Sequence, residues 1–224
     1  TSRSPRAPFT TSTLQQAASN RFGMSPSGTM RAAQKLYEAG LITYMRTDST
    51  NLSGQAVGQI AGVIEKTYGK ELIRVRVYKT KSKNAQEAHE AIRPTNAAKK
   101  SAGHTPEQTR LYQMIWQRAV ASQMADAVLL RTKITANITG ATESIPDFSA
   151  NGSRVLSPGW LIADPGAQGE EVILPQVAQG ETLMLHDIFS EEKQTEPPSR
   201  YTEAGLVKEL EKRGIGRPST YASI

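Results

Sequence analysis

Three side chains near residue 45 could act together on a phosphate group. Tyr44, Arg46 and Asp48 occupy every second position after the apolar start of LITYMRT. Alternate side chains of an extended segment share a face, so we expect these three to project together. A phenol, with a reference pKa near 10, needs help to become a nucleophile, and a nearby guanidinium would favour the phenolate and could grip a phosphate with two hydrogen bonds. Tyr-x-Arg therefore suits attack on a phosphodiester, although the three residues taken alone more often form a strand tyrosine beside a surface salt bridge.

Two further groups of residues could bind an anion. His89 and Arg93 are four positions apart, and would share a face if EAHEAIRP forms a helical turn. A charged histidine and an arginine could hold a phosphate, but a buried, hydrogen-bonded histidine fits equally well. The string GIGRPST offers Arg217, then Ser219 as the N-cap of a new helix, with Thr220 after it. Such a turn presents a guanidinium, two hydroxyls and helix N–H groups to an anion, or simply joins two helices.

Composition narrows the classes of function. The 224 residues include 27 Lys and Arg, 21 Asp and Glu and no cysteine, which excludes disulfides, thiol catalysis and Cys-ligated zinc. No apolar run is long enough to span a membrane, and no P-loop or dinucleotide fingerprint is present. Residues 1–100 carry 16 basic and 6 acidic side chains, whereas residues 101–198 carry 6 and 12. The basic block suggests a region that faces a polyanion, although a lopsided solvated surface would look the same.

The apolar spacing predicts helices in the first half of the chain and strands in most of the second. Capping signals predict helices that begin after Ser12, Ser25, Ser53, Thr105 and Thr202. β-Branched and aromatic residues predict an extended segment at 41–47, and alternation predicts others at 74–78 and 129–138. Short apolar strands of a meander or sandwich are expected to follow to about 185, with a linker at 190–200. The predicted fold class is α+β, with a helical domain followed by a β-rich domain and a short helical C-terminal segment.

Three long strings together resemble a known family. They are GLITYMRTDST at 40–50, EAHEAIRPT at 87–95 and LVKELEKRGIGRPSTYASI at 206–224, and the opening APFTTSTLQQAA agrees with them. In this order they resemble the central part of bacterial DNA topoisomerase I, of the type IA topoisomerase family. Reverse gyrase and topoisomerase III have similar motifs, but Met45 and EAHEAIRPT favour the bacterial topoisomerase I branch. The resemblance is weakest over residues 96–200.

The resemblance implies a role for each candidate residue. Tyr44 would attack single-stranded DNA and become linked to its 5′ phosphate, and Arg46 would hold and polarise the scissile phosphate. His89 would contact DNA near the cleavage site, and Arg93 shares its motif. The turn with Arg217, Ser219 and Thr220 would bind the strand. These roles agree with the chemistry argued above from the residue types.

The resemblance also implies what the parent enzyme holds beyond these residues. We expect a tyrosine-bearing gate domain at 1–126, a strap and hinge domain at 127–198 and the start of a DNA-binding domain at 199–224. The Toprim domain, which supplies acidic ligands for Mg²⁺, is absent, so we expect no metal site here and no relaxation of supercoiled DNA by this chain alone. Expected partners are single-stranded and negatively supercoiled DNA and the missing domains of the same polypeptide, and no membrane. The expected location is the cytoplasm, in association with the nucleoid. The alternative is a non-catalytic single-strand-binding module.

Overall fold

The computed structural model describes residues 1–78, 90–138, 140 and 145–223. Its α-helices are α1 (Thr11–Phe22), α2 (Pro26–Glu38), α3 (Gly54–Tyr68), α4 (Pro106–Ala121) and α5 (Glu203–Lys212). Its strands are β1 (Ser2–Arg3), β2 (Ala127–Ala136) and β3 (Phe148–Ser157), and short 3₁₀ turns are η1 (Lys70–Leu72), η2 (Gly159–Ile162) and η3 (Pro165–Ala167). The fold is thus a mixture of helices and antiparallel strands, which agrees with the coarse fold class expected from the sequence.

Side-chain caps begin the helices where the sequence predicted, with one exception. Ser25, Ser53 and Thr202 each accept a hydrogen bond from the N–H three residues later, as does Thr105 at the start of α4. The prediction for α1 was wrong by two residues, because its N-cap is Thr10, which forms a reciprocal capping box with Thr13. The Ser12 hydroxyl instead donates to Glu211, a partner that lies 199 positions away and that the local pattern does not show.

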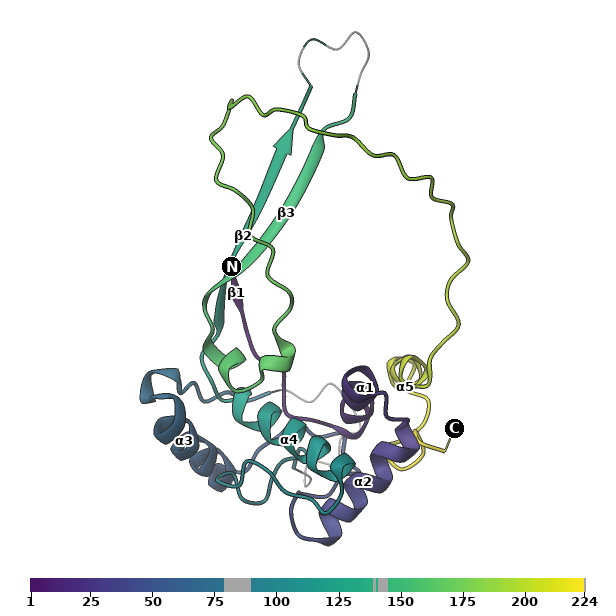
Figure 1. The fold of residues 1–224 in the computed structure, drawn as a ribbon. Coiled ribbons are helices and arrows are strands. Elements are labelled where there is room, and N and C mark those ends of the chain that lie inside the picture. The colour runs from purple at the N-terminus through teal and green to yellow at the C-terminus, as the bar shows by residue number, and fades with distance from the viewer. Residues whose placement is uncertain (79–89, 139, 141–144, 224) are drawn as a thin grey trace.

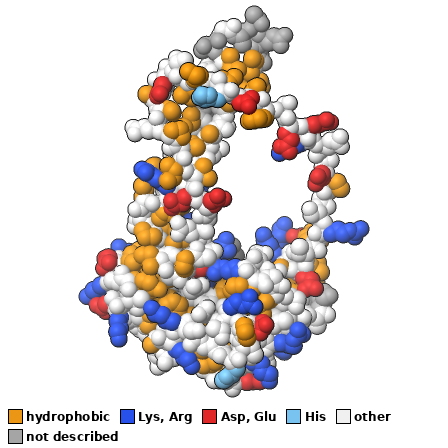
Figure 2. Space-filling model, in the orientation of Figure 1, with side chains coloured by type: hydrophobic (Ala, Val, Ile, Leu, Met, Phe, Trp, Pro, Cys, Tyr) orange, Lys and Arg blue, Asp and Glu red, His pale blue; other side chains and the backbone are white. Residues whose placement is uncertain are grey.

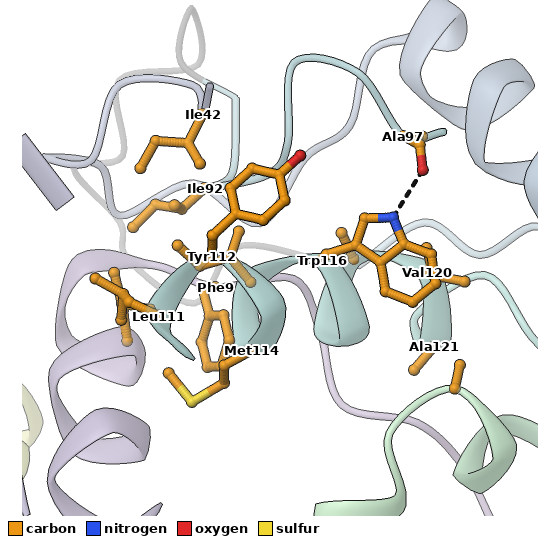
Figure 3. Packing of buried hydrophobic residues seen from close by; sticks show 14 of the residues in the cluster. Phe9, Ile42, Ile92, Ala97, Leu111, Tyr112, Met114, Trp116, Val120 and Ala121 are labelled. Atoms are coloured by element: carbon orange, nitrogen blue, oxygen red, sulfur yellow. Dashed lines mark hydrogen bonds between the residues drawn. The ribbon is translucent and has the colours of Figure 1, made fainter. Parts of the chain in front are cut away.

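One hydrophobic core joins helices α1 to α4. Tyr112 and Leu111 of α4 are fully buried, as are Phe9 before α1 and Ile92 from the segment after α3 (Figure 3). The Trp116 indole in the same helix donates to the Ala97 carbonyl at 2.7 Å, so its polar atom is satisfied inside the core. The apolar side chains of this helix therefore hold the helical layer together.

The sheet is much smaller than the sequence suggested. It has three antiparallel strands in the order β1-β2-β3, and β2 and β3 pair as a hairpin from Val128 opposite Ser157 to Ala136 opposite Phe148, with one register shift after Val128. The predicted meander or sandwich was wrong: the apolar run at 160–162 forms η2, Val172 makes a single bridge to Ser153, and 183–185 is irregular. Short apolar runs do not by themselves decide between a strand and a buried turn, and Trp160, for example, is buried in a 3₁₀ turn.

Two other predictions of local structure also fail, one of a strand and one of a helical turn. Residues 74–78 alternate in sequence but form no strand, because Arg74 and Arg76 donate their N–H groups to the carbonyl and side chain of Gln123 rather than to a neighbouring strand. The predicted helical turn at 87–94 is not helical from Glu90 onward, and its first three residues lie outside the described ranges.

The described chain closes into a ring above the helical layer. The β2–β3 hairpin rises from the end of α4, and a long irregular segment returns from it to α5, which lies beside α1 (Figure 1). The space-filling view keeps an open passage between the hairpin and this returning segment, with many basic side chains on the helical layer below (Figure 2). A return path of this kind brings the C-terminal helix back to the N-terminal one.

Ion pairing and packing hold the two ends of the ring to α1. Asp164, only 1% exposed, pairs with Arg21 at 2.8 Å, which fixes the foot of the returning segment to the end of α1. At the other end α5 packs against α1 and buries Ala204 and Val207. In the described part of the chain, no helix is both long and apolar enough to cross a lipid bilayer.

Candidate active site

Tyr44 lies on a short irregular loop that is fastened to its neighbours on one side. The segment predicted as extended makes only one isolated bridge, between Ile42 and Pro94, and otherwise bends. Thr43 completes the attachment, because its N–H donates to the Arg93 carbonyl at 2.9 Å and its hydroxyl donates to the Ala91 carbonyl at 2.7 Å. These bonds hold the residue immediately before Tyr44 in place.

Thr11, the first residue of α1, holds the other side of the loop. Its hydroxyl donates to the Met45 carbonyl at 2.7 Å and lies 3.1 Å from the Thr47 carbonyl, and it accepts from the Thr47 N–H at 2.9 Å. The Thr11 N–H also donates to the Thr47 carbonyl at 2.9 Å. Thr11 is fully buried, so one side chain fixes the backbone on both sides of Arg46 without solvent competition.

The exposure of the loop follows the predicted alternation. Met45 and Thr47 are buried at 1% and 2%, whereas Tyr44 is 42% exposed and Arg46 is exposed as well. Asp48 is half-buried. Arg46 takes part in none of the ion pairs found among the described residues. The loop thus presents a phenol and a guanidinium to solvent over an anchored backbone.

The C-terminal turn reaches this loop from the far end of the sequence. Burial raises the pKa of Tyr221, the charges of Glu211 and Asp48 raise it further, and Arg217 lowers it, so Asp48 acts on a tyrosine more than 160 positions later in the chain. Ser219 was predicted to be the N-cap of a new helix, but it caps no described helix, because the segment forms successive turns. Thr220 instead accepts the Arg217 N–H at 2.9 Å. The Arg217 side chain is exposed.

The other predicted anion site contains Arg93, and the structure places this arginine in an ion pair with Glu90. Arg93 donates to Glu90 at 2.5 Å, and its side chain is only 14% exposed. Glu90 also accepts the Ser53 N–H at the start of α3. Burial acts to raise the pKa of Glu90, but hydrogen bonds from Arg93 and Ser53 outweigh it and lower the pKa. This placement favours a structural role for Arg93, and His89 lies outside the described residues.

Sequence reasoning missed two residues beside Tyr44. Thr11 was part of a quoted motif but carried no assigned role, and nothing in its local pattern shows that its hydroxyl meets residues 45 and 47. Tyr37 was not among the predicted site residues, yet its ring centroid lies 5.3 Å from that of Tyr44. A local signal was available for Tyr37, because it lies three positions before Gly40, and glycine commonly ends a helix and reverses the chain.

The comparison with known families covers the whole chain. The sequence model described as DNA topoisomerase matches residues 1–224. The chain belongs to the DNA topoisomerase family. This confirms the family that the motifs around Tyr44 and in the C-terminal turn resemble.

Individual topoisomerases agree with this assignment in both sequence and fold. DNA topoisomerase 1 from Streptomyces coelicolor is 49% identical over 99% of this chain, and the Pseudomonas aeruginosa protein of the same name is 47% identical over all of it. The structure of full-length topoisomerase I from Thermotoga maritima matches with a TM-score of 0.81 at 34% identity, over 100% of this chain and 37% of that one. The chain spans about a quarter of the length of the curated topoisomerases it matches.

Proposed function

We propose that this chain is the part of a type IA DNA topoisomerase that carries the nucleophile. The whole enzyme would cut and rejoin one DNA strand and relax negative supercoils without ATP. The observation that carries the proposal is the family match over all 224 residues, with Tyr44 and Arg46 exposed on an anchored loop. An anchored loop suits this chemistry, since a nucleophile must be held close to in line with the reacting phosphorus atom.

The proposed reaction exchanges one phosphodiester for another. The Tyr44 phenol loses its proton and its oxygen attacks the phosphorus, so that a bond from the phenol oxygen to phosphorus forms as the bond to the 3′ oxygen breaks. The 5′ phosphate stays on Tyr44, and the 3′ oxygen takes up a proton to become a hydroxyl. Rejoining reverses each step, and no ATP is needed because one ester bond replaces another. Arg46 would stabilise the negative charge on the phosphoryl oxygens.

Other residues of the chain would guide the strand. Arg217, Ser219 and Thr220 lie on the turn that holds Tyr221, and the charges of both Arg217 and Asp48 act on that tyrosine, so a strand that reaches Tyr44 could also meet the exposed Arg217 guanidinium. For His89 we propose a contact with DNA, because the family resemblance implies one. Arg93 would reach DNA only by leaving Glu90.

The division of labour within the whole protein is part of the same proposal. Residues 1–126 would form the gate domain, 127–198 the strap and hinge, and 199–224 the beginning of a DNA-binding domain. Partners would be single-stranded and negatively supercoiled DNA and the remaining domains of the polypeptide, in the cytoplasm. The chain alone would bind single strands weakly, with an affinity that falls as salt rises, and would not relax DNA.

Magnesium would be bound by residues outside this chain. Among the described residues, no group of three or more His, Asp or Glu side chains is arranged to hold a metal ion. The donor set therefore does not fit a magnesium site within the described ranges, and the steps above use only this chain's own side chains.

Trapping the covalent intermediate tests the proposal. The complete polypeptide, with Mg²⁺, is mixed with a single-stranded oligonucleotide labelled at its 3′ end, so that the label stays with the piece linked to tyrosine. We expect a labelled adduct on a denaturing gel from the wild type and from Tyr68→Phe, and none from Tyr44→Phe. An adduct of equal yield from Tyr44→Phe would refute the assignment. Salt-sensitive strand binding without any adduct would instead identify a non-catalytic binding module.

A further inference from the structure

The ring of Tyr37 lies against the ring of Tyr44. Their centroids are 5.3 Å apart and their planes meet at 65°, which is an edge-to-face arrangement. Tyr37 is 40% exposed and Tyr44 is 42% exposed, so the pair lies at the surface and is not part of the buried core. A contact between two half-exposed rings restricts the orientation of each without sealing either from a substrate.

The backbone turn at the end of α2 brings the two rings together. Gly40 adopts a left-handed conformation with φ of 68°, its N–H donates to the Tyr37 carbonyl at 2.8 Å, and the Leu41 N–H donates to the Leu36 carbonyl at 2.9 Å. This pair of bonds is a Schellman turn, which reverses the chain at the helix end. The chain therefore runs back past the last turn of α2 and brings Tyr44 alongside Tyr37.

We propose that Tyr37 is a positioning residue that holds the phenol of Tyr44 in its reactive orientation. The proposal rests on the function proposed above for Tyr44. The bonds of Thr43 and Thr11 fix the backbone on either side of Tyr44, whereas the ring contact with Tyr37 acts directly on the side-chain torsions of Tyr44. An edge-to-face neighbour biases such a rotamer equilibrium by about two- to tenfold.

A base-stacking role for Tyr37 would leave a different signature. An exposed aromatic ring could receive a nucleobase, in which case its loss would weaken DNA binding. A ring that only orients Tyr44 acts after binding, so its loss would lower the rate at saturating DNA and leave the dissociation constant nearly unchanged. The two roles therefore separate in one set of measurements.

The experiment compares Tyr37→Leu, Tyr37→Phe and Tyr201→Leu with the wild type in the complete polypeptide. Tyr201 is 66% exposed and is not a member of the aromatic pair, so its variant controls for loss of an exposed tyrosine. For each variant, the rate of adduct formation is measured at saturating 3′-labelled oligonucleotide, and the dissociation constant by fluorescence anisotropy. Urea midpoints for each variant verify that it is folded.

We expect Tyr37→Leu to slow adduct formation about three- to tenfold with less than a twofold change in the dissociation constant. Tyr37→Phe, which keeps the ring, and Tyr201→Leu should stay within about twofold of the wild type in both quantities. An unchanged rate for Tyr37→Leu, an equal loss in Tyr37→Phe, or a loss confined to binding overturns the positioning role. Absence of an adduct from the wild type, or its persistence in Tyr44→Phe, refutes the proposed function instead.

Discussion

Replacing Thr11 by valine tests whether one buried hydroxyl holds the loop that presents Tyr44 and Arg46. Valine keeps the branched shape of threonine but can neither donate to the Met45 carbonyl nor accept the Thr47 N–H, which lie 2.7 and 2.9 Å from the hydroxyl. The Thr47 carbonyl keeps one partner, the Thr11 N–H. The substitution therefore leaves one donor and one acceptor without their present partners, in surroundings where Met45 and Thr47 are almost fully buried.

The size of the effect follows from those two groups. A buried donor or acceptor that loses its partner costs about 1–3 kcal/mol, so the loss of two should lower the free energy of unfolding of Thr11→Val by about 2–6 kcal/mol. With a urea m-value of about 2 kcal/mol/M, the unfolding midpoint should fall by about 1–3 M. The matched control is Thr67→Val in α3, where the threonine is exposed and the midpoint should change little.

Function should suffer more than stability in the same variant. When the carbonyl and N–H on either side of Arg46 are released, the loop can adopt other conformations, so adduct formation by the complete polypeptide should slow even well below the unfolding transition. Circular dichroism during urea titration and the denaturing gel described above measure the two effects. A midpoint for Thr11→Val equal to that of Thr67→Val would show that the hydroxyl does not hold the loop.

Three further predictions concern the surroundings of the site. Both polar side-chain atoms of the buried Gln15 lack a hydrogen-bond partner within the described ranges, so Gln15→Leu should raise the free energy of unfolding by about 1 kcal/mol, and a lower urea midpoint would contradict this. Arg21→Ala leaves the carboxylate of Asp164 buried and unpaired, and should cost about 3 kcal/mol in the same assay, whereas a loss below about 1 kcal/mol would mean that the pair contributes little. The pKa of Glu90 is lowered in the folded protein, so its ionised carboxylate adds to the free energy of unfolding. This contribution is complete above the ordinary pKa of glutamate and is lost as pH falls through the lowered pKa. Stability of the wild type should then decline more steeply than that of Glu90→Gln between about pH 5 and pH 3, and parallel curves would refute this.

The sequence alone determined most helix starts and the alternating exposure of residues 44–47, because both depend on short-range chemistry. Ser25, Ser53 and Thr105 predicted helix starts correctly, since a cap is a bond between residues three positions apart. The alternation at 44–48 likewise predicted which side chains face solvent. The family motifs are contiguous strings, so they too can be recognised without a structure.

Only the tertiary structure decided what surrounds Tyr44. The partners of the Thr11 hydroxyl lie 34 and 36 positions away, and Ser12 meets Glu211 across 199 positions. The contact of Tyr37 with Tyr44 depends on how the chain reverses at Gly40. Local spacing carries no information about such pairs, because they form only when separate helices pack and bring their ends together. The same reason explains the predicted strands that did not form, since a strand needs a partner that the sequence pattern does not name.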